Sequence, residues 1–221
     1  MDPLLKYFNI INYSLLECCK YKIHEKALKL IESGIYDPYE TDIEGYTPLI
    51  YLCKNEMDNT ALKLIKDLDC SHSNIYGDTA LLWACTHKMD EVALKIIETG
   101  KSNLSQINNF GETALTIACY NKRTEVAIKI IETNKLIETN KLNLSHINYH
   151  CETALSLACY YKMDDVAFKL LELEKNNEFF LNKIYLTVKN KMYNIICLLI
   201  LTKYEDEDEN EIYIKNKLLL K

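Results

Sequence analysis

The chain has 221 residues, of which 48% are hydrophobic and 26% are charged, and its formal net charge is −6. This is the composition of a folding, soluble protein, and the acidic balance argues against nucleic acid as a partner, because phosphate binding needs clustered Lys and Arg. No signal-like segment opens the chain, and its longest apolar run, 195–201, is far shorter than the roughly 18–20 residues of a membrane span. We therefore expect a cytoplasmic protein that is not secreted, with no nucleic acid and no membrane as partner.

An N-terminal capping segment is predicted over residues 1–12. Asp2 and Pro3 supply a helix start, since Pro is favoured at the first helical position. The apolar residues that follow recur at helical spacing, so this helix is expected to cover the first apolar stripe of what comes next.

The stretch 13–204 is an array of internal repeats. A Thr followed by Pro or Ala and then Leu recurs at intervals of 32, 34 and 40 residues, and a Cys stands six residues after each Thr. These residues are Thr47, Thr79, Thr113 and Thr153, with Cys53, Cys85, Cys119 and Cys159. In a degenerate first unit, Tyr13 takes the Thr position and Cys19 the Cys position. The predicted units are 13–46, 47–78, 79–112, 113–152, 153–181 and 182–204, the last also degenerate, as expected for the ends of a stack.

Each unit is predicted to hold two short helices joined by a tight turn. In residues 79–100 two apolar stripes at helical spacing flank a polar break at 87–90. Gly34, Gly100 and Asn134 are predicted to end second helices, because they adopt the left-handed conformation cheaply. Helix pairs this short cannot bury their stripes alone, so the units must stack on one another.

Between units the sequence predicts a hairpin-like turn. An Asp or Asn three residues before a Gly closes an Asx-type turn and the Gly supplies a positive φ, while the next Thr is placed as a helix N-cap. The Asp and Asn residues are Asp42, Asn74, Asn108 and Asn148, the last with Cys151 in place of Gly. The 40-residue interval is explained by a tandem duplication, IETNKL at 131–136 and again at 137–142, which predicts either extra helical turns or a bulged loop at the surface.

The pattern Gly-x-Thr-[Pro/Ala]-Leu, followed by a small apolar pair and Val-Ala-x-Lys-Leu-Leu, resembles the ankyrin repeat over 13–204. The resemblance implies an all-α repeat solenoid, in which helix–turn–helix units stack and β-hairpin-like fingers join them. It also implies a non-catalytic protein that binds another protein. Gly-[Asp/Glu]-Thr-Ala-Leu and Ala-Cys are similar to ankyrin arrays of giant DNA viruses and some protists, which would make this a viral protein acting on a host.

The chain departs from the family pattern in three respects. The family's His after Thr-Pro-Leu and its Gly between the two helices are both replaced, and only 29 residues separate Thr153 from Asn182, so the hairpin between the last two units is expected to be missing. Ile50, Leu82, Thr116 and Ser156 replace the His, and Glu56, Lys88, Lys122 and Lys162 replace the Gly.

No catalytic, cofactor or metal site is predicted. The repeated cysteines recur once per unit, about 10 Å apart, which is beyond the reach of a disulfide or a shared zinc, so we expect small buried hydrophobes. His146, His150 and Cys151 form the one clustered set of metal-binding residue types, but no second pair accompanies them. Phosphate-loop, nucleophile-elbow and zinc-protease signatures are absent, so the chain is not expected to be an enzyme and no cofactor is expected.

The resemblance places partner binding on a concave face formed by the hairpin tips and the exposed side of each first helix. Carried onto this sequence, the candidate residues are Tyr46, Tyr76, Asp78, His87, Phe110, Glu112, Tyr120, Tyr149, His150, Tyr160 and Tyr161. Exposed aromatic side chains are typical of binding hot spots. The alternative is that the tip aromatics only staple neighbouring hairpins together. Trp83 shares a repeat position with Tyr51, Ile117 and Leu157 and is expected in the core.

The expected partner is a protein of unknown identity, bound by a monomer. Two other functions stay open, a self-assembling structural protein and an adaptor that recruits substrates to a ubiquitin ligase. The tail 205–221 opens with the acidic run EDEDENE. This run is either a solvated segment without a partner or a segment that attracts a basic partner. Its apolar end, 212–220, is either a short helix on the last unit or a peptide ligand.

Overall fold

The computed structural model describes residues 13–66, 68–136, 143–144 and 146–174, which belong to two compact units divided between Leu142 and Asn143. The predicted capping helix, second IETNKL copy, sixth unit and acidic tail lie outside the described residues. Unit 1 contains α2 (Leu15–Lys20), α3 (His24–Ser33), α4 (Pro48–Lys54), α5 (Asp58–Ile65), α6 (Ala80–Thr86), α7 (Asp90–Glu98), α8 (Ala114–Tyr120) and α9 (Thr124–Leu136). Unit 2 contains α10 (Ala154–Tyr160) and α11 (Asp164–Glu174).

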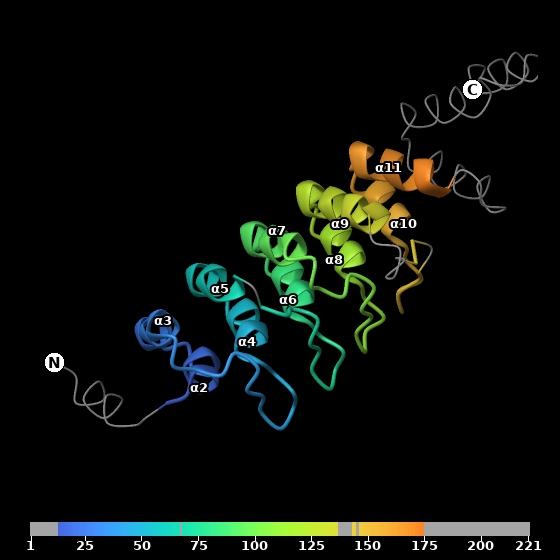
Figure 1. The fold of residues 1–221 in the computed structure, drawn as a ribbon. Coiled ribbons are helices and arrows are strands. Elements are labelled where there is room, and N and C mark those ends of the chain that lie inside the picture. Colours follow the sequence, from blue (N-terminus) through green and yellow to red (C-terminus); the bar gives the residue numbers. More distant parts are fainter. Residues whose placement is uncertain (1–12, 67, 137–142, 145, 175–221) are drawn as a thin grey trace, which may run out of the picture. The chain divides into compact units, whose positions relative to one another are not determined.

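In unit 1 the helices form two rows. The first helices α2, α4, α6 and α8 contact one another in sequence, and so do the second helices α3, α5, α7 and α9 (Figure 1). The loops that join one pair to the next project on one side, next to the first helices (Figure 1). We call these loops fingers 1 to 3, residues 42–46, 74–78 and 108–112. Within the described residues, the β structure consists of a single antiparallel bridge between Ser73 and Thr79. The predicted all-α solenoid of stacked pairs is confirmed.

The core runs between the two rows. Leu52 and Cys53 of α4, Leu81 of α6 and Ile96 of α7 are almost fully buried. Burying each large aliphatic side chain stabilises the fold by about 1.5–3 kcal/mol, and neighbouring pairs supply the other wall of the core. In the described part of the chain, no helix is both long enough and apolar enough to cross a membrane.

Threonine N-caps start the first helices as predicted. Each Thr hydroxyl accepts a hydrogen bond of 3.1–3.3 Å from the N–H three residues on, at Thr47, Thr79, Thr113 and Thr153. In the first repeat the cap is Ser14, in a capping box with Glu17, so this helix begins one residue later relative to Tyr13 than the other first helices begin relative to their Thr. A side-chain oxygen at the third helical position completes the box at Thr116 and Ser156, whereas the apolar Ile50 and Leu82 cannot.

The turn between the two helices of a pair is left-handed despite the missing Gly. The residues in the family's Gly position have φ of 57–60°, and they are Glu56, Lys88, Lys122 and Lys162. Gly34 and Gly100 are also left-handed at helix ends, as predicted. The prediction for Asn134 is wrong, because α9 continues through it to Leu136. The first IETNKL copy therefore extends the helix, so that α9 has 13 residues where α7 has 9.

Candidate protein-interaction face

Each finger is an Asx turn. The side-chain Oδ1 of its first residue accepts hydrogen bonds of 2.9–3.1 Å from the N–H groups two and four residues on, as in Asp42, Asn74 and Asn108. Asn148 does the same in unit 2, whose finger 4 we define as residues 148–152. The residue in the predicted Gly position has a positive φ in each finger, including Cys151 at 61°. The predicted turn chemistry is confirmed.

Fingers 1 to 3 are tied to one another through both backbone and side chains. Ile75 N–H donates to the Glu44 carbonyl at 3.0 Å, and Asn109 N–H to the Tyr76 carbonyl at 2.8 Å. Tyr76 Oη donates to Glu44 Oε1 at 3.3 Å, and Asn108 Nδ2 to Asp78 Oδ1 at 2.9 Å. The fingers of unit 1 are therefore a braced row rather than independent loops.

Two of the candidate residues do not face solvent. Tyr46 exposes only 3% of its surface and Asp78 only 8%, so the expectation that both are exposed is wrong. Tyr46 is buried because its ring stacks on Tyr51, with the centroids 4.8 Å apart. Asp78 is buried because it receives the Asn108 amide of the next finger. Both side chains belong to the packing of the finger face, a term we use for the fingers and first helices of unit 1.

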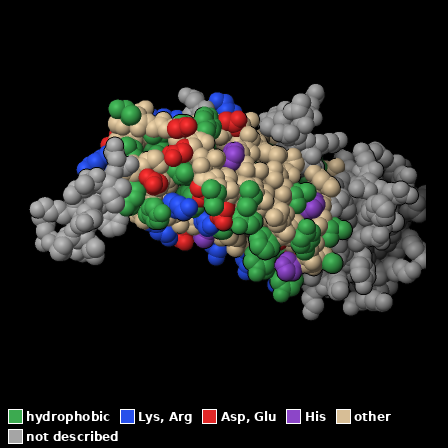
Figure 2. All heavy atoms as spheres, turned by 90° about the horizontal axis from the view of Figure 1, so that it is seen from below, with side chains coloured by type: hydrophobic (Ala, Val, Ile, Leu, Met, Phe, Trp, Pro, Cys, Tyr) green, Lys and Arg blue, Asp and Glu red, His purple; other side chains and the backbone are tan. Residues whose placement is uncertain are grey.

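The other candidates in unit 1 are at least partly exposed. Phe110 exposes 67% of its surface and Tyr120 57%, Tyr76 is exposed at its finger tip, and His87 and Glu112 are half-buried. Glu112 is held by Thr116, whose hydroxyl donates to its carboxylate at 2.6 Å. On the left of Figure 2, where the N-terminal helix pairs lie, hydrophobic side chains are interspersed with acidic and basic ones.

In unit 2, Tyr149 exposes 75% of its surface and Tyr160 70%, His150 is exposed and Tyr161 is half-buried. The rings of Tyr160 and Tyr161 meet edge to face at 4.9 Å. These four side chains belong to unit 2.

The stapling alternative describes Tyr76 well. Its hydroxyl bonds to Glu44 of the preceding finger, and its ring lies 6.4 Å from that of Tyr46. The negative charge of Glu44 raises the pKa of Tyr76. Phe110 has no polar atom with which to brace its neighbours and stays largely exposed. Tyr76 thus braces neighbouring fingers, whereas Phe110 does not.

An aromatic cluster that the sequence did not predict lies beside these fingers. We define it as Tyr46, Tyr51, Lys54, Trp83 and His87, contributed by finger 1, α4, α6 and the residue that follows α6. Lys54 Nζ lies 4.2, 5.9 and 5.4 Å from the ring centroids of Tyr46, Tyr51 and Trp83, and it donates to Tyr46 Oη at 3.0 Å. Trp83 stacks on His87 at 5.6 Å and is only half-buried, so its expected place in the core is wrong.

A charged pair borders the cluster. Asp42 Oδ2 accepts from Lys20 Nζ at 3.0 Å and from Tyr51 Oη at 2.6 Å. Burial opposes ionisation of Asp42, but the hydrogen bonds from Tyr51 and Lys20 outweigh it and lower its pKa to about 2. Burial and the bond to Asp42 raise the pKa of Tyr51 to about 12. At neutral pH, Lys20 and Asp42 are therefore a matched ion pair.

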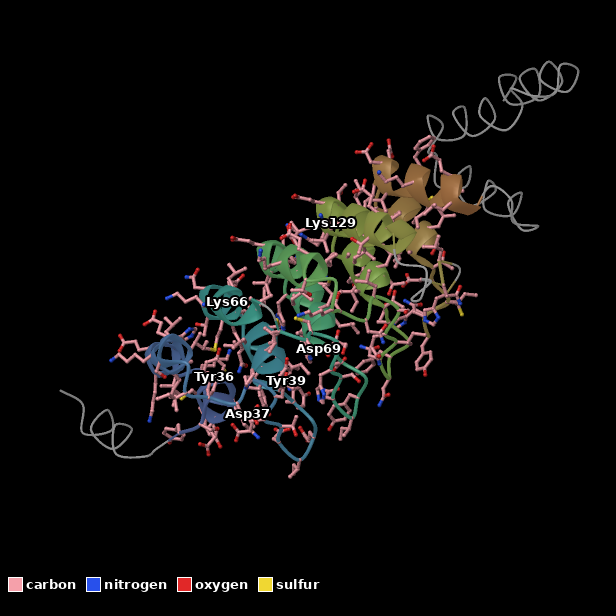
Figure 3. All side chains as sticks on the ribbon, viewed as in Figure 1. Tyr36, Asp37, Tyr39, Lys66, Asp69 and Lys129 are labelled. Carbon is pink, nitrogen blue, oxygen red and sulfur yellow. The ribbon has the colours of Figure 1, made fainter. Side chains whose placement is uncertain are left out.

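The opposite row of second helices differs in character. Lys66 and Lys129 lie on this row, away from the fingers, whereas Tyr39 and Asp69 lie on the linking segments (Figure 3). There the Asp69 N–H donates to Tyr39 Oη at 3.1 Å. A surface hollow of about 240 Å³ near the ends of α5 and α7 is lined by Lys66, Lys95, Glu98, Thr99 and Lys101. Its walls are charged side chains and one Thr, with none of the aromatic anchors found near the fingers.

The repeated cysteines are buried and form no disulfide, as predicted for small hydrophobes: Cys19, Cys53, Cys85, Cys119 and Cys159. Burial raises the pKa of Cys85 and Cys159 to about 12, so they stay protonated at neutral pH. Within the described residues, no group of three or more His, Cys, Asp or Glu side chains is placed to hold a metal ion.

The family comparison agrees with this architecture. Residues 15–107 match the family model for ankyrin repeats, in three copies. No curated protein matches the chain. Ankyrin repeats generally mediate protein–protein interaction and are generally not catalytic. The chain is therefore an all-α repeat solenoid in which residues 15–107 match three ankyrin repeats.

Proposed function

We propose that the chain is a non-catalytic module that binds a protein partner through the finger face of unit 1. The observation that carries this proposal is a row of exposed apolar side chains on successive fingers, Ile43, Ile75 and Phe110, which the core does not need. Exposed apolar groups gathered on neighbouring fingers mark interaction surfaces more often than scattered single ones do.

Rigidity makes this row suitable for binding. The Asx turns fix each finger, and the hydrogen bonds between fingers fix the row. A partner therefore loses little free energy to ordering the surface, which is the usual cost of binding to loops. Tyr76 and Tyr120 add rigid aromatic area, which hot spots favour.

The Phe110→Ala variant tests the proposal. We expect partner affinity to fall at least about tenfold, because loss of an aromatic anchor at an interface costs about 1.4 kcal/mol or more. The melting temperature should hardly change, since Phe110 is largely exposed. The partner would be recovered from the native cell by affinity purification, identified by mass spectrometry, and measured in purified form by calorimetry.

Ile35→Ala is the matched control, because Ile35 is an 80% exposed apolar residue that follows α3 rather than lying on a finger. Its affinity for the partner should equal that of the unchanged protein. If Ile35→Ala and Phe110→Ala weaken binding equally, or if neither does, the finger face is not the binding surface.

The setting we propose is a monomer in a reducing, intracellular compartment, which agrees with the free thiols in the described residues. Unit 2 would add its own contacts through Tyr149, His150, Tyr160 and Tyr161. Self-assembly is the competing function, and light scattering of the pure protein would reveal it as a mass above that of one chain.

A further inference from the structure

The repeats provide an internal standard, and the aromatic cluster departs from it at several positions at once. Tyr46 stands before the N-cap Thr, where the corresponding residues are Asp78, Glu112 and Glu152. Lys54 ends its first helix at a position that Lys20 also holds in the first repeat, whereas Thr86, Tyr120 and Tyr160 stand there in the later repeats. His87 follows its first helix where α4 and α8 are followed by Asn55 and Asn121, and α2 and α10 by Tyr21 and Tyr161. Local departures from a consistent pattern, concentrated in one place, are typical of functional sites.

These departures leave polar atoms without partners. Within the described residues, the buried side-chain nitrogens that lack a hydrogen bond are Asn74 Nδ2, Trp83 Nε1 and His87 Nε2. Trp83 and His87 belong to the cluster, and Asn74 opens the finger that follows Tyr46. Such orphaned groups are uncommon in native proteins and cost stability.

The repeat comparison explains two of these orphans. In finger 3 the amide of Asn108 donates to Asp78, but the residue corresponding to Asp78 in finger 1 is Tyr46, so Asn74 has no carboxylate to meet. Asn55 and Asn121 donate to the carbonyls of Cys19 and Cys85, which lie in the last turn of the preceding first helix.

His87 makes a different contact. Its Nδ1 lies 3.4 Å from Glu56 and its ring stacks on Trp83. The cluster thus stands where two contacts made elsewhere between neighbouring repeats are absent, that of Asn108 with Asp78 and that of Asn55 or Asn121 with the preceding first helix.

Lys54 carries a positive charge without a carboxylate beside it. Among the described residues, no carboxylate oxygen lies within 4.0 Å of its ammonium group, whereas Lys20 is paired with Asp42 at 3.0 Å. Lys54 instead lies over the faces of three rings and uses one of its three N–H donors on Tyr46 Oη. The neighbouring Trp83 Nε1–H is a second donor, and it has no acceptor.

We propose that the aromatic cluster receives one carboxylate of the protein partner, from an Asp or Glu side chain. The ammonium of Lys54 pairs with it. The Nε1–H of Trp83, which is buried in the free chain, donates to its second oxygen once the Lys54 side chain moves off the ring toward the ligand and uncovers it. An anionic acceptor fits both groups, because the two are donors only and one is a cation. This inference rests on the proposed function and specifies what the partner presents.

The surroundings restrict the ligand to a single acidic residue. Glu44 and Glu56 border the cluster, where they contact Tyr76 and His87 respectively. A run of acidic residues would be repelled by them, whereas one carboxylate flanked by apolar side chains would satisfy Lys54 and place those apolar groups on the fingers.

A phage-displayed random peptide library, selected against the full chain, supplies the probes. Trp83 is the only Trp in the chain, so peptides without Trp can be titrated by its fluorescence. We expect the selected peptides to carry one Asp or Glu whose change to Asn or Gln weakens binding about tenfold, which is about 1.4 kcal/mol. Lys54→Met, which keeps the apolar stem and removes the charge, should weaken the original peptide by a similar factor and leave the amide peptide nearly unaffected.

Two further variants complete the test. Trp83→Phe keeps an aromatic ring and removes the donor, and binding followed by calorimetry should weaken severalfold. Lys129→Gln removes one positive charge from the second-helix row (Figure 3) and should change affinity less than about twofold. Melting curves by circular dichroism confirm that each variant is folded.

The results that would overturn the inference are distinct from those that would overturn the proposed function. Peptides that need no acidic residue, or equal effects of Lys54→Met and Lys129→Gln, exclude the carboxylate site. If such peptides still lose affinity with Phe110→Ala, the finger face remains the binding surface. If selection yields no peptide that binds, both are wrong.

Discussion

Gly77→Ala is expected to lower the free energy of unfolding of unit 1 by about 3 kcal/mol, and Gly100→Ala by only about 1 kcal/mol. Both glycines are left-handed, with φ of 76° and 64°. A non-glycine residue in that region costs roughly 1–2 kcal/mol in either case. The difference between the two variants therefore comes from what the new methyl group meets.

At Gly77 that methyl group meets the backbone of the next finger. A Cβ there would lie 2.8 Å from the Ile107 carbonyl oxygen and 2.9 Å from Asn108 Cα, which are closer than such contacts occur. At Gly100 nothing lies within 4 Å of the added Cβ. Finger 3 must move away from finger 2, which stretches the bond of 2.8 Å between Asn109 N–H and the Tyr76 carbonyl.

Urea unfolding followed by circular dichroism gives both values, with Gly100→Ala as the control for backbone strain alone. Phe110 is carried on finger 3, so Gly77→Ala should also weaken partner binding in protein that is still folded. Equal destabilisation by the two substitutions would show that finger 3 can move away from finger 2 without loss of folding free energy. The fingers would then not be a braced row.

Raising the pH above about 9 is expected to destabilise unit 1 steeply, through its buried thiols. Burial raises the pKa of Cys70 to about 11 and that of Cys85 to about 12, and it also raises those of Cys18, Cys19 and Cys53 above the ordinary value of 9.0. Because each folded pKa is higher than the unfolded one, the contribution of each thiol to stability is fully present below pH 9.

The loss begins when the unfolded chain ionises while the folded one stays protonated. Between about pH 9 and the folded pKa, each thiol then removes about 1.4 kcal/mol of stability for every pH unit. Cys70 and Cys85, whose folded pKa values are about 11 and about 12, together remove about 3 kcal/mol per pH unit, and the other three thiols act in the same direction. Since an ordinary domain is stable by only about 5–15 kcal/mol, we expect the free energy of unfolding of unit 1 to fall steeply above pH 9.

Urea titrations between pH 7 and pH 10 measure this slope. Cys85→Ala should make it shallower by about one thiol's share, which separates the thiols from Tyr and Lys groups that titrate nearby. Cys151→Ala, at the exposed thiol of finger 4, should leave the unfolding of unit 1 unchanged. A slope unaffected by Cys85→Ala would mean that the thiols do not govern alkaline unfolding.

The sequence by itself determined the repeating framework, because that framework depends on contacts within a few residues. The hydroxyl of Thr79 reaches an N–H three residues on, and the Oδ1 of Asn74 reaches N–H groups two and four residues on. Both patterns can be recognised from spacing alone. The burial of Cys53 and its equivalents followed from their recurrence at one position of an apolar stripe.

Local sequence did not fix where a helix ends when a favourable continuation follows. Asn134 resembles a helix end, yet α9 continues to Leu136, since Asn tolerates the helical conformation as well as the left-handed one. The duplicated hexamer supplies the extra helical residues.

Only the tertiary structure decided whether the side chain at a given repeat position is buried or exposed. Tyr46 is buried because Tyr51 and Lys54 pack against it, and Asp78 is buried because Asn108 of the next finger reaches it. Trp83 is half-exposed although Leu157, at the same repeat position in unit 2, is buried. Exposure at these positions depends on the side chains that a neighbouring element brings opposite, and such contacts join residues about 30 positions apart along the chain, as with Asn108 and Asp78. The period of the repeat determines which positions are equivalent, and the side chains of the neighbouring repeat determine whether each of them is buried or exposed.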